Sequence, residues 1–113
     1  MQVALECKLL LESGNKSVVY FRPVDEALVA LKLRTPIRLT EDDSSLHVWV
    51  EGHCFHLELN VVFIIVEPDP HGRPQDRQAM LEYMKSAGWL TAEEYTGQYL
   101  SSPKLGQMPE PRW

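Results

Sequence analysis

The sequence predicts an α+β fold in which a small antiparallel β-sheet, built from hairpins, is followed by a C-terminal two-helix hairpin. Three observations support this prediction. Apolar residues alternate with a period of two in several stretches before residue 66. Three prolines and a glycine then fall within residues 67–74. After them, apolar residues recur at helical spacing. The chain has 113 residues, of which 44% are hydrophobic, which suits a single domain.

The first two strands form a hairpin in this interpretation. Residues 3–12 alternate between apolar and mostly polar side chains, which is typical of a half-buried strand. Ser13-Gly14-Asn15 is a cluster of turn-forming residues. Residues 17–21 are rich in β-branched and aromatic side chains and predict the returning strand.

Residues 24–33 allow two interpretations. Val24, Ala27, Leu28 and Leu31 fit the spacing of a short helix, whereas Ala27, Val29, Leu31 and Leu33 fit a strand. A short helix or helical turn is favoured because the preceding residues make an acceptable first turn. Pro36 prevents a helix from continuing, and a short strand is expected at 37–40.

A second hairpin is predicted around Glu51-Gly52. The alternating runs Leu46–Val50 and His53–Leu59 flank these two residues, which resemble a tight two-residue turn. In that register His47 lies opposite His56 and Trp49 lies opposite Cys54. Together with Glu58 these residues share one face, and the core face gathers Leu46, Val48, Val50, Phe55 and Leu57. Residues 61–66 are continuously apolar, as expected of a strand covered on both faces.

These patterns divide the chain into an antiparallel sheet body at 1–66, a proline-rich linker at 67–74, a helical hairpin packed on the sheet at 75–100 and a flexible tail at 101–113. The first helix is expected to end at Gly88, which is a typical C-cap. Thr91 and Glu94 have the spacing of a capping box that begins the second helix.

The C-terminal segment contains Gly88, Trp89, Leu90 and Thr91, followed by Glu93, Glu94 and Tyr95. With these residues, the stretch 77–100 resembles the SHOCT (short C-terminal domain) family of helical hairpins. The family pairs two short helices through a Gly-hydrophobic-hydrophobic-Thr turn followed by Glu-Glu-aromatic. The corresponding residues here are Gly88, Trp89, Leu90, Thr91, Glu93, Glu94 and Tyr95. The chain departs from the pattern at 96–99, where the family usually continues with basic residues. The resemblance implies an accessory or oligomerisation role and not an enzyme.

Composition disfavours several classes of protein. The chain has 11 basic and 16 acidic residues, a net charge of −5, and no cluster of Lys and Arg. This charge distribution therefore disfavours direct nucleic-acid binding. The longest apolar run, residues 61–66, is too short to span a membrane, and the first residues lack the pattern of a signal peptide. With two cysteines, expected to be reduced, the protein is predicted to be cytoplasmic.

Two groups of residues could carry ligand chemistry. His47, Cys54 and His56 offer imidazole and thiolate ligands on one face of the predicted hairpin, which suggests a zinc site. Arg34 and Arg38 form an Arg-x-x-x-Arg pair that could clamp a small anionic ligand. No Gly-x-Ser-x-Gly elbow or glycine-rich phosphate loop is present, and a Cys54–His56 nucleophile pair lacks an orienting acid.

The sequence therefore predicts a protein that is not an enzyme and needs no cofactor. We expect a non-catalytic protein–protein interaction module, an adaptor or inhibitor of bacterial or phage type, that binds a protein partner or itself. Because aromatic side chains anchor many interfaces, the predicted contact residues are His47, Trp49, His56, Trp89 and Tyr95. The alternatives are a metal-binding protein and the anionic-ligand sensor.

Overall fold

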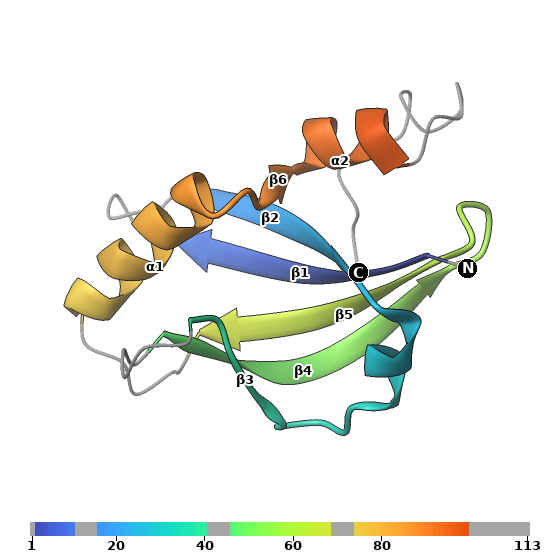
Figure 1. The fold of residues 1–113 in the computed structure, drawn as a ribbon, viewed down its shortest axis with the longest axis horizontal. Helices are drawn as coiled ribbons and strands as arrows, with labels where there is room; N and C mark the ends of the chain where they lie inside the picture. Colours follow the sequence, from blue (N-terminus) through green and yellow to red (C-terminus); the bar gives the residue numbers. More distant parts are fainter. Residues whose placement is uncertain (1, 11–15, 41–45, 69–73, 100–113) are drawn as a thin grey trace.

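The computed structural model describes residues 2–10, 16–40, 46–68 and 74–99. It contains a sheet of six strands in the order β3-β4-β5-β1-β2-β6, together with two α-helices (Figure 1). The predicted α+β class is confirmed. The expected turn at 13–15, most of the expected linker and the expected tail at 101–113 lie outside the described residues. The elements in chain order are β1 (Gln2–Leu10), β2 (Ser17–Val24), the 3₁₀ helix η1 (Glu26–Ala30), β3 (Pro36–Arg38), β4 (His47–His56), β5 (Val61–Pro68), α1 (Pro74–Ser86), β6 (Leu90–Thr91) and α2 (Ala92–Tyr99).

The sheet is mixed, whereas the sequence analysis expected only antiparallel pairs. β1 and β5 pair in parallel, from Gln2 opposite Val61 to Cys7 opposite Val66. The other strand pairs of the described sheet are antiparallel. The central position of these two strands explains their composition, because a strand with neighbours on both sides and cover on both faces needs an apolar run. Five successive residues of β1, from Val3 to Cys7, are buried.

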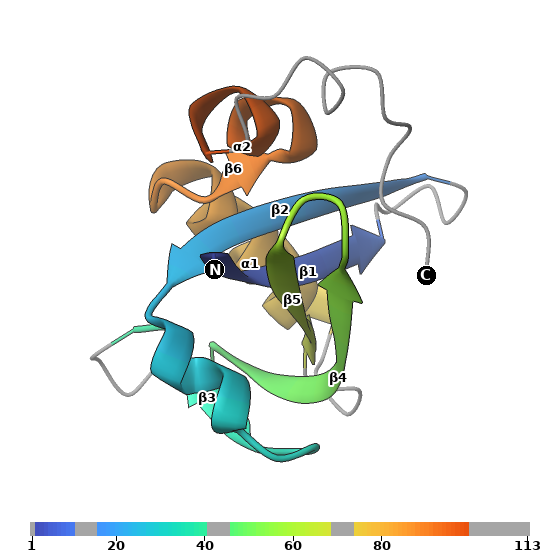
Figure 2. The same ribbon diagram turned by 90° about the vertical axis from the view of Figure 1, so that its right-hand side faces the viewer.

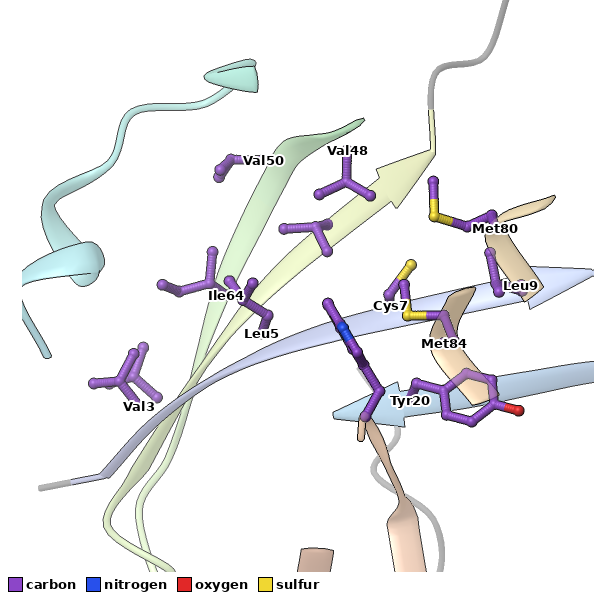
Figure 3. Close-up of a cluster of buried hydrophobic side chains, with 13 residues drawn as sticks. Val3, Leu5, Cys7, Leu9, Tyr20, Val48, Val50, Ile64, Met80 and Met84 are labelled. Atoms are coloured by element: carbon purple, nitrogen blue, oxygen red, sulfur yellow. The ribbon is translucent and has the colours of Figure 1, made fainter. Parts of the chain in front are cut away.

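One face of the sheet carries the larger core. Alternate residues of β1, together with Val48 and Val50 of β4 and Ile64 of β5, face α1 and η1. Figure 3 shows Met80 and Met84 of α1 pointing toward Cys7 and Leu9. The buried members of this larger core are Val3, Leu5, Cys7, Leu9, Tyr20, Val48, Val50, Val62, Ile64, Val66, Met80, Met84 and Trp89. We call this side of the sheet the first face.

The opposite side, the second face, carries a smaller aromatic core. Its buried residues are Ala4, Phe21, Val61, Phe63 and Tyr95, the last from α2. The Tyr95 ring stacks on Phe21 at a centroid distance of 5.4 Å and meets the edge of Phe63 at 6.0 Å. Since neighbouring residues of a strand point to opposite faces, Ala4 of β1 belongs to this core while Val3 and Leu5 belong to the other.

The two helices therefore do not pack on each other as the expected hairpin. α1 contributes to the first-face core and α2 to the second-face core, and β6 lies between them in the chain (Figures 1 and 2). β6 pairs with β2 through Leu90 opposite Phe21, so the chain changes faces at this edge of the sheet. A strand between the helices separates them, which the capping pattern alone could not reveal.

Both predicted helix caps are confirmed. Gly88 has a φ of 80°, the left-handed conformation that favours glycine after a helix end. The Thr91 Oγ1 accepts from the Glu94 backbone N–H at 3.2 Å, and a Glu94 carboxylate oxygen accepts from the Thr91 N–H at 3.1 Å. This reciprocal pair is a capping box.

In the ambiguous stretch 24–33, the helical interpretation holds in a short form. η1 begins after Asp25, whose carboxylate accepts from the Ala27 backbone N–H at 2.8 Å. Leu28 and Leu31 pack against the first-face core, whereas Val29 is exposed. A single 3₁₀ turn therefore satisfies the helical spacing without a full helix.

The predicted hairpin at Glu51-Gly52 is wrong. β4 runs through both residues as one strand and pairs with β5 from Val48 opposite Pro68 to His56 opposite Val61. The reversal comes later, in the turn at residues 57–60. Asn60 has a φ of 53°. Asparagine tolerates this left-handed conformation better than most residues, which makes it the residue that closes the turn.

Candidate interaction surface

β4 contains a β-bulge that sets which side chains share a face. Val50 pairs with Val66 and Gly52 pairs with Ile65, so Glu51 is an extra residue without a partner on β5. An extra residue reverses the alternation of side chains beyond it. His47 and Trp49 before the bulge therefore share the second face with Cys54 and His56 after it.

The predicted grouping of these four side chains thus survives although its reason was wrong. A two-residue turn and a one-residue bulge both shift the alternation by one position, so each places the same side chains together. We call the side chains of His47, Trp49, Cys54 and His56 the β4 strip. All four are half-buried.

Aromatic contact and small residues shape the β4 strip. The rings of His47 and Trp49 meet edge to face at a centroid distance of 5.6 Å. Gly52 lies between the two halves, and a Cβ there would only just touch the Ile65 Cδ1, at 4.0 Å. Because glycine has no side chain, it leaves the half-buried Ile65 uncovered on the second face. The apolar side chain of Ile65 therefore lies between Trp49 and Cys54.

Acidic residues border the strip. Burial, and to a lesser extent the Glu6 carboxylate, raise the pKa of the Cys54 thiol. Glu6 is itself buried in the second face. The thiol is therefore held in its neutral form around neutral pH, which removes a charge from the strip and makes Cys54 a poor nucleophile.

α2 covers only one end of the second face. Tyr95 packs on Phe21 and Phe63, near the start of β5. Trp49 lies opposite Glu67 at the far end of that strand, and no described helix packs there. The Trp49 Nε1 and the His56 Nδ1 are buried without a hydrogen-bond partner among the described residues. Buried polar atoms are normally paired, so these two atoms are exceptions to the usual pattern.

The geometry that suggested a zinc site is absent. His47 and His56 are nine positions apart on one strand, a separation of roughly 30 Å at the usual rise per residue. Within the described part of the chain, no three His, Cys, Asp or Glu side chains gather as metal ligands would. The strip therefore brings His47 to Trp49 and Cys54 toward His56, but not the two histidines to each other.

The structure places Arg34 in the turn that precedes β3 and Arg38 at the end of that strand. Arg34 has a φ of 66°, and its backbone N–H donates to the carbonyl oxygen of Val50. Arg38 lies opposite His47. The two arginines are four positions apart, which at the usual rise of an extended strand is at most about 13 Å between their Cα atoms. Anion binding by their two guanidinium groups stays a prediction.

Two of the predicted contact residues belong to the core. Trp89 is buried in the first face, where the Arg22 guanidinium carbon lies 6.0 Å from its ring centroid. Tyr95 is buried in the second face. Both were predicted to contact a partner, but their aromatic rings are buried and attach the C-terminal segment to the sheet.

Sequence reasoning missed a second exposed feature near the end of β4. Phe55 and Leu57 were predicted to face the core, but they are 49% and 81% exposed. Phe55 does lie on the first face, opposite Val62, at an edge that η1 leaves partly open. Leu57 lies in the turn instead of a strand. The sequence signal that could have predicted this turn is Asn60, because asparagine tolerates the left-handed backbone conformation.

Comparisons with protein-family models, curated proteins and solved structures found no match. No helix in the described ranges has the length and apolar character needed to cross a membrane.

Proposed function

We propose that this chain is a non-catalytic protein-binding module and that the β4 strip is its binding surface. The observation that carries the proposal is the unequal cover of the sheet. α1 and η1 pack over the first face, whereas α2 packs over only one end of the second face. The His47–Trp49 half of the strip lies at the part left without a described helix, and the Cys54–His56 half adjoins the core that α2 covers.

The composition of the strip supports this role. It combines an indole, two imidazoles and a neutral thiol around the side chain of Ile65. Interface centres are depleted in charged residues and enriched in aromatic ones, and Trp is among the commonest hot spots. Trp49 is therefore the expected anchor. Such a module acts as an adaptor or as an inhibitor, depending on whether the partner keeps its activity when bound.

The test compares wild type with Trp49→Ala. Affinity capture from cells of the source organism, followed by mass spectrometry, identifies proteins retained by the wild type. Each is then purified and its affinity measured by calorimetry. Because a hot-spot residue is worth about 2 kcal/mol or more, we expect Trp49→Ala to weaken binding by roughly thirtyfold.

Tyr99→Ala is the matched control, because Tyr99 is an exposed aromatic residue on α2 that does not belong to the strip. It should leave the affinity unchanged. Circular dichroism checks that both variants are folded, and His56→Ala replaces Trp49→Ala if the latter unfolds. Equal affinities for the wild type and a folded strip variant would rule out the strip as the binding surface.

A further inference from the structure

The outer edge of β4 is only partly occupied. β3 pairs with His47, Val48 and Trp49. Next along the edge, the Val50 N–H donates to the Thr35 carbonyl oxygen at 3.0 Å. Beyond this point, residues 51–56 have β5 on one side and no strand of the described chain on the other (Figure 2).

The part of this open edge beyond Glu51 lacks the usual protection. Exposed edges are normally blunted by charged residues, proline or a bulge. Residues 52–57 read Gly-His-Cys-Phe-His-Leu, and the bulge lies before them at Glu51. The edge also carries exposed apolar area, because Phe55 and Leu57 lie along it and Leu33, 62% exposed, directly precedes the residue bonded to Val50.

We propose that the chain forms a two-fold symmetric dimer in which the open edges of β4 from two copies pair antiparallel. A strand that pairs antiparallel with itself is self-complementary, so one edge supplies both sides of a closed interface. The proposal concerns the strand edge and does not depend on the side-chain surface proposed above.

The occupied part of the edge selects the register. With Cys54 on the two-fold axis, Gly52 faces His56 of the second copy and His53 faces Phe55 of the second copy. Moving the partner strand two residues one way would displace Arg34 and Thr35 from Val50, and moving it the other way would leave only three paired residues. The Cys54-centred register is therefore the longest that keeps the existing bonds.

Charges and apolar side chains also match in this register. Because Glu51 is an extra residue, the count across it shifts by one, and Leu57 of the second copy falls next to Val50, where Arg34 is bonded and Leu33 precedes it. Glu58 of the second copy follows Leu57 in the turn, on the side of Arg34. An acidic and a basic residue therefore approach each other at each end of the paired strands. The exposed leucines of the two copies thus cover each other, which a partner strand of unrelated sequence would not ensure.

The dimer should be weak. Five paired residues and a few apolar side chains bury less than the roughly 1,600 Å² of a standard stable interface. We therefore expect it to dissociate on dilution, and sedimentation velocity of the purified full chain over a wide concentration range should show a monomer–dimer equilibrium. A chain that stays monomeric to near-millimolar concentration would overturn the proposal. This holds even if the open edge of β4 were found to bind a strand from a different protein.

Cys54 reports the register directly. Opposite residues of an antiparallel pair have Cα atoms about 4.5–5.5 Å apart, within the range that a disulfide bridges. Oxidation with diamide at about pH 9, where more thiol is ionised, should join two copies through Cys54. Two thiols lose two protons and two electrons in this step, and diamide accepts them. Cys7 is buried and should not react.

The matched control moves the thiol to another exposed apolar site. Leu10, 58% exposed at the end of β1, is replaced in the double variant Leu10→Cys/Cys54→Ser. Each crosslinking rate is divided by the alkylation rate of the same thiol. We expect the Cys54 rate to be at least tenfold the Leu10→Cys rate. Equal normalised rates would indicate random collision and would contradict this register.

A charge placed on the edge should prevent pairing. Phe55→Lys introduces one of the natural edge-blocking residues, and Leu10→Lys places the same charge elsewhere. We expect the dimer affinity to fall at least tenfold for Phe55→Lys and to stay within twofold for Leu10→Lys. If Phe55→Lys does not fold, Leu57→Lys in the turn takes its place. Trp49→Ala should dimerise like the wild type. Failure of the dimer proposal is therefore distinguishable from failure of the proposed binding surface.

Discussion

At the scale of single residues, Tyr95 couples the stability of the second face to pH. Burial, and less strongly the neighbouring Tyr99, raise the pKa of the Tyr95 hydroxyl from 10.0 to about 12. The folded chain thus holds this proton more tightly than the unfolded chain does. The resulting stabilisation is complete below pH 10 and is lost as the pH rises from 10 toward 12.

Tyr95→Phe should therefore flatten the alkaline loss of stability. At pH 7 it removes one long hydrogen bond to Gln2, of 3.3 Å, which costs about 1 kcal/mol or less. Urea unfolding at pH 7, 10 and 11 measures both effects. Cys7, whose pKa is raised from 9.0 to about 12, keeps its own alkaline contribution in both proteins. An identical decrease in wild type and variant would contradict this account of Tyr95.

At the scale of elements, the sequence predicts which side chains share a face better than it predicts the path of the chain. Alternation placed Val48 and Val50 in the core and Trp49 outside it, and both assignments hold. It could not distinguish a turn at Glu51-Gly52 from a bulge, because both shift the alternation equally. The cross-strand pairing of His47 with His56, on which the metal hypothesis depended, is absent, whereas the shared face is present.

Deleting Glu51 should be far more damaging than removing its side chain. Without the extra residue, either Val48 and Val50 or the segment from Cys54 onward must exchange faces. Each buried valine that becomes exposed costs about 1.5–3 kcal/mol, so we expect a loss of at least 3 kcal/mol or failure to fold. Glu51→Ala keeps the residue count, and its exposed side chain should be worth less than about 0.5 kcal/mol.

Urea unfolding and far-ultraviolet circular dichroism of the two variants check this prediction. A deletion variant that unfolds within 1 kcal/mol of Glu51→Ala would mean that the strand absorbs the missing residue without reversing its faces. In that case the bulge would not determine the composition of the β4 strip.

At the scale of the whole molecule, the sequence did not predict which segments pair when they lie far apart along the chain. The apolar run of β5 predicted a strand covered on both faces, but not that its neighbour would be β1 in parallel. The caps of α1 and α2 were predictable from local chemistry because their bonds join residues close in sequence. Their placement on opposite faces depends on the pairing of Leu90 with Phe21, which are far apart in sequence.

This arrangement makes the C-terminal helices part of one cooperative unit and not an appended hairpin. Tyr83 of α1 donates to the Leu39 carbonyl oxygen at 3.0 Å and accepts from Arg22 of β2 at 3.4 Å, so α1 joins segments from both ends of the sheet. Met84 fills the first-face core, and Phe63 packs under α2 in the second. Loss of either core should therefore weaken the whole fold.

We accordingly expect Met84→Ala and Phe63→Ala each to lower the free energy of unfolding by about 2–5 kcal/mol, with a single transition in both variants. Tryptophan fluorescence and far-ultraviolet circular dichroism should give the same urea midpoint, because Trp89 lies in the core between the sheet and α1. An independent hairpin would behave differently. Met84→Ala would then separate the two signals, with the helical signal lost at lower urea while the sheet, including Phe63 and its neighbours, kept the wild-type midpoint.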